Sequence, residues 1–339
     1  MRNLLAVCSI LLCGIVHVYG QSAFGGGDPA LEAKGLRGLL GGFTLHASTG
    51  YGITFYSHEI NGPGILQVKD SAVFLFDNFY VISDTLDAGY THWINDAIVS
   101  DSIPIGDEDF LLGTDTLAVK YKATGGSIPI SLAVSYTYDR YRFGLGFTYE
   151  QLFGTKYYPG VASNKLEPFK TEYTTTSLTR YYLYFGGEVF RSIRHTIAVD
   201  ATLGTYRFGK KHFNPDQVKT TLFFNLGVSF ERSLSEYFKV FVRPSVELKN
   251  YNLTVPGLDY KVNHTMPAFY VSVGAMLRMP DLRKCPISSC HTQRNHPHGD
   301  KLYRSRAHPF WKWQNPNYGQ NYPELVKYKG RNKRKLNPY

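Results

Sequence analysis

Apolar and polar side chains alternate with a period of two along most of residues 41–280. In Leu222–Glu231, every second residue is a large apolar side chain, and Asn225, Gly227 and Ser229 lie among the residues between them. Successive side chains of a β-strand point to opposite faces, so this pattern predicts a strand with one apolar and one polar face. An amphipathic helix would instead space its apolar residues three and four apart. Nine segments show the alternation: Phe43–Phe55, Leu117–Tyr121, Ile130–Tyr138, Phe143–Tyr149, Tyr181–Val189, Ile197–Thr205, Leu222–Glu231, Phe238–Leu248 and Phe269–Leu277.

The polar face of these segments carries charged side chains, which are too costly to expose to hydrocarbon. We therefore predict an all-β fold, an antiparallel transmembrane β-barrel. Its apolar face would meet outer-membrane lipid and lipopolysaccharide, and its polar face would line a wet lumen. The charged residues that we assign to the lumen are Arg180, Glu188, Asp200, Glu231, Lys239, Arg243 and Glu247.

Single-chain bacterial barrels have an even number of strands, so nine segments imply one more. Ala72–Phe76 is strand-like and lies between Ile65 and Ile82. We predict ten strands, with eight as the alternative. The interior of so small a barrel is only slightly wider than side chains can fill. The lumen charges would pair across it and close it, and a narrow pore for small solutes is the other possibility.

The first residues of the chain resemble a secretory signal. Arg2 precedes an apolar run from Leu4 to Val18, and small residues follow before Gln21. This is the pattern of a cleaved signal peptide, and the run is too short for a permanent membrane helix. We predict a signal peptide at 1–20, an N-terminal periplasmic segment at 21–40, the barrel at 41–280 and a basic periplasmic tail at 281–339.

The links between the predicted strands differ in length, and this difference predicts which end of the barrel faces the periplasm. Outer-membrane barrels have short periplasmic turns and longer extracellular loops. The tail would then leave the last strand in the periplasm. Residues 83–114 would be a periplasmic link if the tenth strand exists and an outer loop if it does not. The short links are Asp139–Arg142, Arg191–His195 and Ser233–Glu236, and the long polar ones are Gly154–Ser177, Gly209–Gln217 and Asn250–Pro267.

The net charge of the protein lies entirely in the tail. Residues 281–339 contain 13 Lys/Arg and 3 Asp/Glu, a net of +10, which equals the charge of the whole chain, so residues 1–280 are neutral. Few aliphatic residues follow residue 281, so we expect an irregular segment that is either disordered or folded upon a partner.

Interspersed aromatic and basic residues are typical of interfaces, which indicates a periplasmic protein or scaffold as the partner. An anionic surface would suit the charge, and the exported location argues against nucleic acid. The alternative is that the aromatic residues fold back on the barrel rim. The predicted partner-binding residues are Tyr303, Arg304, Arg306, Trp311, Trp313, Asn315, Tyr318 and Tyr322.

Cys285 and Cys290 are the only cysteines outside the predicted signal peptide, and His291, His296 and His298 follow them closely. Thiols in an exported chain are usually paired, so we expect a disulfide. Two thiolates and two imidazoles could instead hold a metal ion, although Cys-x4-Cys with His-x-His is an unfamiliar spacing. We therefore predict a disulfide between Cys285 and Cys290 and no bound metal ion.

The predicted outer loops contain His58, His212 and His264. A hydrolytic site would need a base with its orienting group, or an acid pair, at the outer rim, and no spacing in the sequence indicates one. We therefore expect a protein that is not an enzyme and needs no cofactor.

Together, an aromatic and Gly-rich barrel and a tail with Cys285-Pro286-Ile287 and Trp313-Gln314-Asn315-Pro316 resemble outer-membrane barrel proteins of the Bacteroidota. The accessory barrels of the type IX secretion and gliding machinery belong to that group. The resemblance implies a non-enzymatic barrel that anchors a periplasmic complex. The alternative function is a narrow outer-membrane channel for small solutes.

Overall fold

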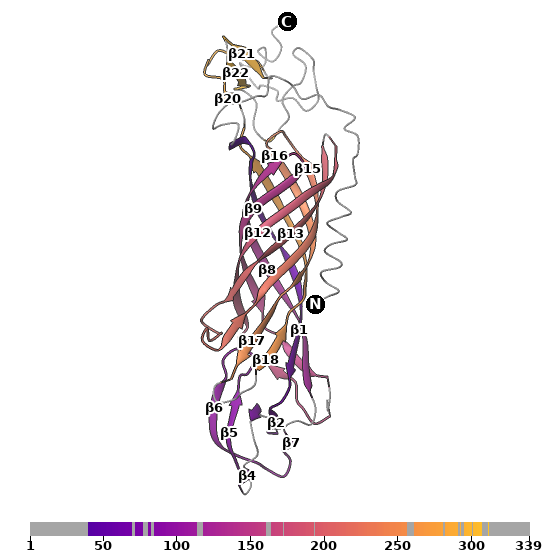
Figure 1. Ribbon diagram of the computed structural model, residues 1–339, viewed down its shortest axis with the longest axis vertical. Coiled ribbons are helices and arrows are strands. Elements are labelled where there is room, and N and C mark those ends of the chain that lie inside the picture. Colours follow the sequence, from indigo (N-terminus) through magenta and orange to yellow (C-terminus); the bar gives the residue numbers. More distant parts are fainter. Residues whose placement is uncertain are drawn as a thin grey trace, which may run out of the picture.

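The computed structural model describes residues 40–69, 72–76, 81–82, 85–113, 118–160, 164–171, 173–192, 194–255, 261–280, 282–290, 292, 295–299, 301–306 and 311. The predicted signal peptide, residues 21–39 and all residues after 311 lie outside the described part of the chain. The molecule is elongated. A barrel occupies its middle, one small sheet lies at one end and a larger one at the other (Figure 1).

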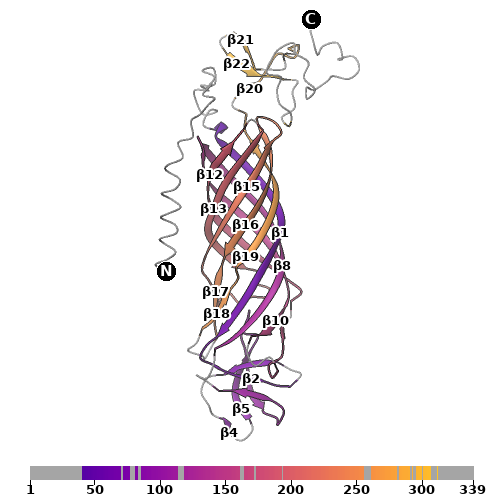
Figure 2. The same ribbon diagram turned by 90° about the vertical axis from the view of Figure 1, so that its right-hand side faces the viewer.

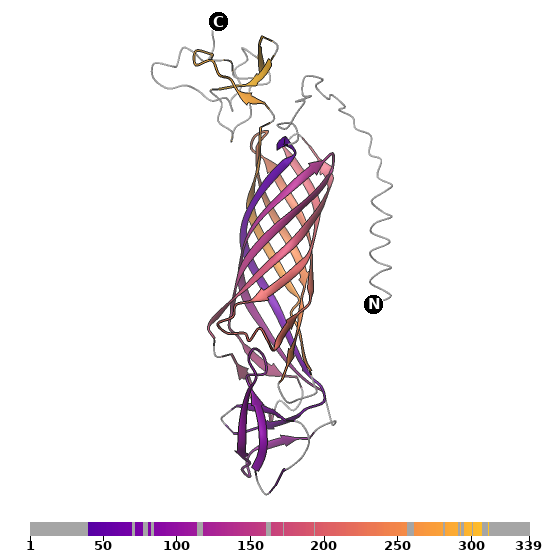
Figure 3. The same ribbon diagram turned by 60° about the vertical axis from the view of Figure 1, so that its left-hand side comes forward.

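Eight long strands form the barrel, and each pairs antiparallel with its neighbours. The ring closes because β1 pairs with β19 on one side and with β8 on the other (Figure 3). The predicted antiparallel β-barrel is confirmed. Its strands are β1 (Phe43–Ile60), β8 (Val119–Tyr138), β9 (Tyr141–Phe153), β12 (Thr175–Arg191), β13 (His195–Phe208), β15 (Leu222–Ser233), β16 (Phe238–Leu248) and β19 (Ala268–Arg278).

The prediction of ten strands is wrong, and the alternative of eight is correct for the described residues. Two predicted segments, Leu117–Tyr121 and Ile130–Tyr138, belong to the single strand β8. The sequence between them contains Pro129, which breaks most strands because it has no N–H to donate. Here its carbonyl accepts a hydrogen bond from Thr49 Oγ1 at 3.1 Å, and the pairing with β9 continues through it. The predicted tenth strand, at Ala72–Phe76, lies in a separate sheet.

The alternation in the sequence corresponds to the two faces of the ring. Leu145 is 65 % exposed, and Ile130 and Phe230 are also exposed, because their side chains point outward. Inward positions carry polar and small residues. A Cβ atom at Gly227 would come within 2.7 Å of the Arg243 guanidinium, so any other residue there would displace this side chain. Glycine therefore makes room for the charged side chains of the interior.

The connections divide the barrel into two different ends. At the short-turn end, β8 turns into β9 at residues 139–140, and the chain enters β1 and leaves β19 nearby. At the long-loop end, β1 and β8 continue past the ring, and four further strands extend the wall: β10 (Lys156–Pro159), β14 (Val218–Thr220), β17 (Asn250–Thr254) and β18 (Lys261–Thr265), with β11 (Phe169–Lys170) beside β10.

Six short strands between Gly64 and Leu112 form a second sheet at the long-loop end (Figure 2). The described part of the predicted link, residues 85–113, therefore belongs to this sheet at the long-loop end and does not join barrel strands at the short-turn end. An aromatic core that includes the buried Trp93 and Tyr121 joins this region to the barrel mouth. The strands are β2 (Gly64–Gln67), β3 (Val73–Phe76), β4 (Val81–Ile82), β5 (Thr85–Thr91), β6 (Ile98–Pro104) and β7 (Phe110–Leu112).

The beginning of the tail is also folded. A three-stranded sheet at the short-turn end has the order β20-β22-β21, with β20 parallel to β22 and β21 antiparallel to it. The prediction of a wholly irregular tail is therefore wrong for these residues. The strands are β20 (Arg283–Lys284), β21 (His296–His298) and β22 (Lys301–Arg304).

In the part of the chain described here, no helix has both the length and the apolar character that a membrane span needs.

Candidate functional site

The barrel interior contains a first group of buried charges toward the long-loop end. Arg180 on β12 forms ion pairs with Glu150 and with Glu247, its Nη2 lying 3.2 Å from Glu150 Oε2. Lys249 Nζ lies 3.1 Å from Glu247 Oε1 and 3.5 Å from Glu150 Oε2. Tyr270 donates a 2.7 Å hydrogen bond to Glu150 and accepts one from Lys249. Two cations and two carboxylates thus balance each other here, which offsets the cost of removing them from water.

A second group lies toward the short-turn end. Arg142 on β9 forms buried ion pairs with Glu188 and Glu231, and Lys239 Nζ lies 3.0 Å from the second Glu231 oxygen. These four charges balance, and the exposed Arg191 adds a third cation beside Glu188. Within the same end of the lumen, His46 Nε2 lies 2.7 Å from Ser135 Oγ.

A third, smaller group lies between the other two. Arg243 Nε is 3.6 Å from Asp200 Oδ2, and Tyr184 donates a 2.6 Å hydrogen bond to the other Asp200 oxygen. Every described carboxylate in this stretch of the lumen thus faces a cation or a hydroxyl group.

The structure places all seven predicted lumen charges inside the ring and pairs each of them. The sequence reading missed Arg142, because it treated this residue as the end of a turn. In the structure β9 begins at Tyr141, and Arg142 is the first inward-pointing residue after the two-residue turn. The alternation of Phe143, Leu145 and Phe147 extended one residue backward would have identified it.

The space that remains inside the ring is small. Near the second charge group, a cavity of about 370 Å³ at the short-turn end is lined by Arg142, Glu188 and Lys239 among others. Deeper in the lumen, cavities of about 80 and 50 Å³ lie beside Asp200 and Arg180. Arg243 lines both of the smaller cavities, so the described side chains occupy most of the interior beyond the short-turn end.

The predicted outer-loop histidines lie at the other end of the barrel. His58 on β1 and His264 on β18 face each other and are fully buried, beyond the part of β1 that pairs with β19. His212 instead packs beside Tyr173 in the β13–β14 link. Burial lowers the pKa of His58 to about 3 and holds the pKa of His264 well below its ordinary value, with the neighbouring His58 adding to the second effect.

The two buried histidines predict a loss of stability in acid. The unfolded chain takes up protons as the pH falls below 6.5, the ordinary histidine value, whereas folded His58 stays neutral down to about 3. The long-loop end is therefore most stable at a pH above 6.5, and its stability falls progressively as the pH drops below that value. Trp93 packs against His58 at 6.4 Å between ring centroids and reports on the site.

The measurement uses Trp93 fluorescence in the Trp311→Phe/Trp313→Phe background. We expect a steady signal from about pH 8 to about pH 5 and a change only toward pH 3. The His58→Gln/His264→Gln variant should lose the transition. A midpoint near 6.5 in the folded protein would contradict the buried, neutral pair.

The predicted partner-binding residues fall into two sets. Tyr303 and Arg304 lie on β22, the guanidinium of Arg306 donates hydrogen bonds to the carbonyls of Cys285 and Pro286, and Trp311 is exposed. The remaining predictions, Trp313, Asn315, Tyr318 and Tyr322, lie outside the described residues.

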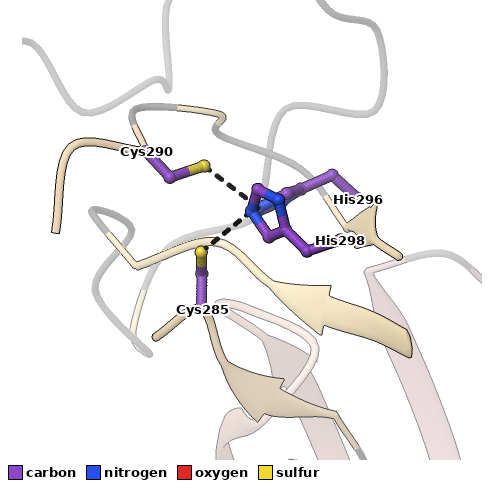
Figure 4. Close-up of side chains that lie close together, drawn as sticks. All are labelled: Cys285, Cys290, His296 and His298. Carbon is purple, nitrogen blue, oxygen red and sulfur yellow. Dashed lines mark hydrogen bonds between the residues drawn. The ribbon is translucent and has the colours of Figure 1, made fainter. Parts of the chain in front are cut away.

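Cys285, Cys290, His296 and His298 come together beside the tail sheet (Figure 4). Both cysteines are free thiols in the structure, which therefore does not have the expected disulfide. Each sulfur instead lies beside an imidazole. Cys285 Sγ is 3.2 Å from His298 Nε2, and Cys290 Sγ is 3.1 Å from His296 Nε2. These four side chains could hold a metal ion.

A closed antiparallel ring with an apolar outer face and a polar, charge-paired interior defines a transmembrane β-barrel of the outer-membrane type. No protein-family description matches the sequence, and no curated protein matches it significantly.

Three solved structures show partial overlap. The Escherichia coli outer-membrane protease OmpT has 10 % identity and a TM-score of 0.31. The matched region covers 70 % of this chain and 96 % of the OmpT chain. The β-barrel of the InvG secretin domain from the Salmonella injectisome has 10 % identity and a TM-score of 0.15, covering 73 % and 65 %. A Pseudomonas aeruginosa FadL homologue has 7 % identity and a TM-score of 0.15, covering 70 % and 90 %. At these values none of the three assigns an activity to this chain.

Proposed function

We propose that this protein is a non-enzymatic outer-membrane barrel that holds a periplasmic protein complex at the membrane through residues 281–339. The observation that carries the proposal is an interior occupied by paired charges along most of its length. Paired, buried charges around Arg180 and around Arg142 occupy the lumen. The lumen side chains therefore stabilise the barrel and do not line a path for solutes. The function then falls to the surfaces outside the ring.

The position of the tail supports its role as the docking element. It leaves β19 at the short-turn end, and short turns are periplasmic in outer-membrane barrels. Its net charge of +10 suits an acidic protein surface. Trp311 is 51 % exposed and is the kind of side chain that anchors interfaces. The resemblance to accessory barrels of type IX secretion and gliding machinery makes such a complex the first candidate partner.

The narrow channel remains the second candidate function because of the cavity of about 370 Å³ at the short-turn end. A solute could enter this cavity, but to go further it would have to pass the charges around Asp200 and Arg180. Conduction therefore requires the interior charge groups to move apart.

The test compares the full-length protein with a variant that lacks residues 281–339. After cross-linking in intact cells, we expect the full-length barrel to recover one defined periplasmic complex and the truncated barrel to recover none. Both proteins should keep the folded barrel, seen as heat-dependent migration on gels, because the described strands of the tail form a sheet of their own outside the ring. Neither should conduct in a planar bilayer.

Charge reversal provides a matched control. Arg283→Glu/Lys284→Glu changes the exposed basic strand β20, and we expect recovery to fall about tenfold. Lys120→Glu/Lys122→Glu makes the same change at the long-loop end and should leave recovery unchanged. If deletion of the tail left the recovered partners unchanged and the barrel conducted ions, the anchor function would be rejected in favour of the channel.

A further inference from the structure

The four residues Cys285, Cys290, His296 and His298 converge from three separate pieces of the tail. Cys285 follows β20, Cys290 ends the turn that its own N–H closes on the Ile287 carbonyl, and both histidines lie on β21. Residues two apart on a strand point to the same side, so the His-x-His spacing presents two imidazoles together. Figure 4 shows both rings facing the two sulfur atoms.

The distances between the ligand atoms are within a few tenths of an ångström to about one ångström of those in a small tetrahedral site. Zinc binds sulfur at about 2.3 Å and imidazole nitrogen at about 2.0–2.1 Å, which separates tetrahedral ligand atoms by roughly 3.4–3.8 Å. Here His296 Nε2 lies 3.0 Å from His298 Nε2, and each is 3.1–3.2 Å from one sulfur. All four ligand atoms lie within 4.8 Å of one another. A slight outward movement of these side chains makes room for an ion at their centre.

From this geometry we infer that Cys285, Cys290, His296 and His298 bind one Zn²⁺ ion in a structural site that holds the tail sheet together. Two thiolates and two imidazoles select zinc over magnesium or calcium, which prefer oxygen ligands. Four protein ligands complete the tetrahedron and leave no position for substrate, which is the arrangement of a structural and not a catalytic zinc.

The tail sheet needs such a link because its strands are very short. They contain two, three and four residues, and Leu282 and Cys285 are its buried apolar residues among those described. So little apolar surface cannot stabilise a sheet by itself. A metal would join the residue after β20 to β21, the two edges of the sheet on either side of β22. Binding of zinc and folding of this sheet are then one process.

A disulfide between Cys285 and Cys290 is the competing chemistry, and the two exclude each other. A disulfide would bring the sulfurs to about 2.05 Å and remove both thiolates as metal ligands. The backbone N–H of Cys285 bonds to the Arg304 carbonyl at 3.1 Å, and Arg306 holds the carbonyl of Cys285. These contacts fix Cys285 in the sheet, with its sulfur beside His298.

The test measures metal in the purified, folded full-length protein. By elemental mass spectrometry we expect one zinc ion per chain in the wild-type protein. The variants Cys285→Ser/Cys290→Ser and His296→Ala/His298→Ala should contain about 0.1 zinc ions per chain or less. His195→Ala, at an exposed histidine of the same end of the barrel, should keep the full zinc content. Cobalt in place of zinc should give the visible absorption of tetrahedral cobalt and a thiolate charge-transfer band in the wild-type protein.

A second measurement separates a metal site from a variant that fails to fold. Removal of zinc by a chelator should make residues 281–306 sensitive to protease while the barrel keeps its heat-dependent migration, and added zinc should restore resistance. Wild-type protein without zinc, or with its two cysteines joined and lighter by two hydrogen atoms, would overturn the inference. The inference does not depend on the docking function, because it concerns the fold of the tail and not its partner.

Discussion

Replacing Arg180 with methionine is expected to destabilise the folded barrel by about 3–5 kcal/mol. The side chain is buried and pairs with both Glu150 and Glu247, so its removal leaves a cluster with two carboxylates and one cation. Lys249 and Tyr270 cannot replace the second charge. The free energy of unfolding, measured by urea titration of the protein in lipid vesicles, checks this value.

Two further variants make this prediction sharper. In Arg180→Met/Glu247→Gln the charges balance again, and much of the lost stability should return, because removal of a whole buried pair costs far less than removal of one member. Lys120→Met breaks the exposed pair with Glu59 at the long-loop end and should cost at most about 1 kcal/mol. If the double variant were as unstable as the sum of the single ones, the interior charges would not act as a balanced group.

Leu145→Arg is expected to cost about 2–4 kcal/mol if the outer face of the ring meets lipid. Leu145 lies on β9 opposite Val134 and Leu183, and it is among the most exposed apolar residues of the chain. An arginine there would have to reach the membrane surface from the middle of the apolar band. The equilibrium between unfolded protein and protein folded in vesicles measures this cost.

Tyr141→Arg is the matched control on the same strand. Tyr141 is the first residue of β9, beside the turn and opposite Tyr138. Aromatic residues mark the membrane interface in such barrels, where arginine costs about 0–1 kcal/mol. If Leu145→Arg and Tyr141→Arg destabilised the protein equally, the ring would not be surrounded by a membrane. Only a bilayer makes the free-energy cost of an arginine depend on its depth.

The barrel could be predicted from the sequence because its wall is a local pattern. A strand between lipid and a polar lumen must alternate at every second residue, as Leu222–Glu231 does, and no distant contact is needed to see it. The lumen charges followed from the same alternation. The number of strands did not, because Pro129 and the preceding glycines look like a break, and only the pairing of β8 with both β1 and β9 shows that the strand continues.

The long-loop end and the tail could not be predicted in the same way. The strands between Gly64 and Leu112 alternate poorly because they are short, and because β2 and β3 are buried on both faces against cores formed with distant segments. The cysteines and histidines of the tail were visible as a group, but the choice between disulfide and metal depends on where the sulfur atoms lie. That position is fixed by β22, which separates β20 from β21.

The sequence by itself therefore determined the class of fold, the two faces of the wall and the separation of a neutral barrel from a basic tail. These are properties of neighbouring residues in a chain that must satisfy lipid on one side and water on the other. Only the tertiary structure decided the strand count, the charge groups that fill the lumen and the convergence of Cys285, Cys290, His296 and His298. Each of these depends on which distant segments lie side by side, and no local pattern specifies that.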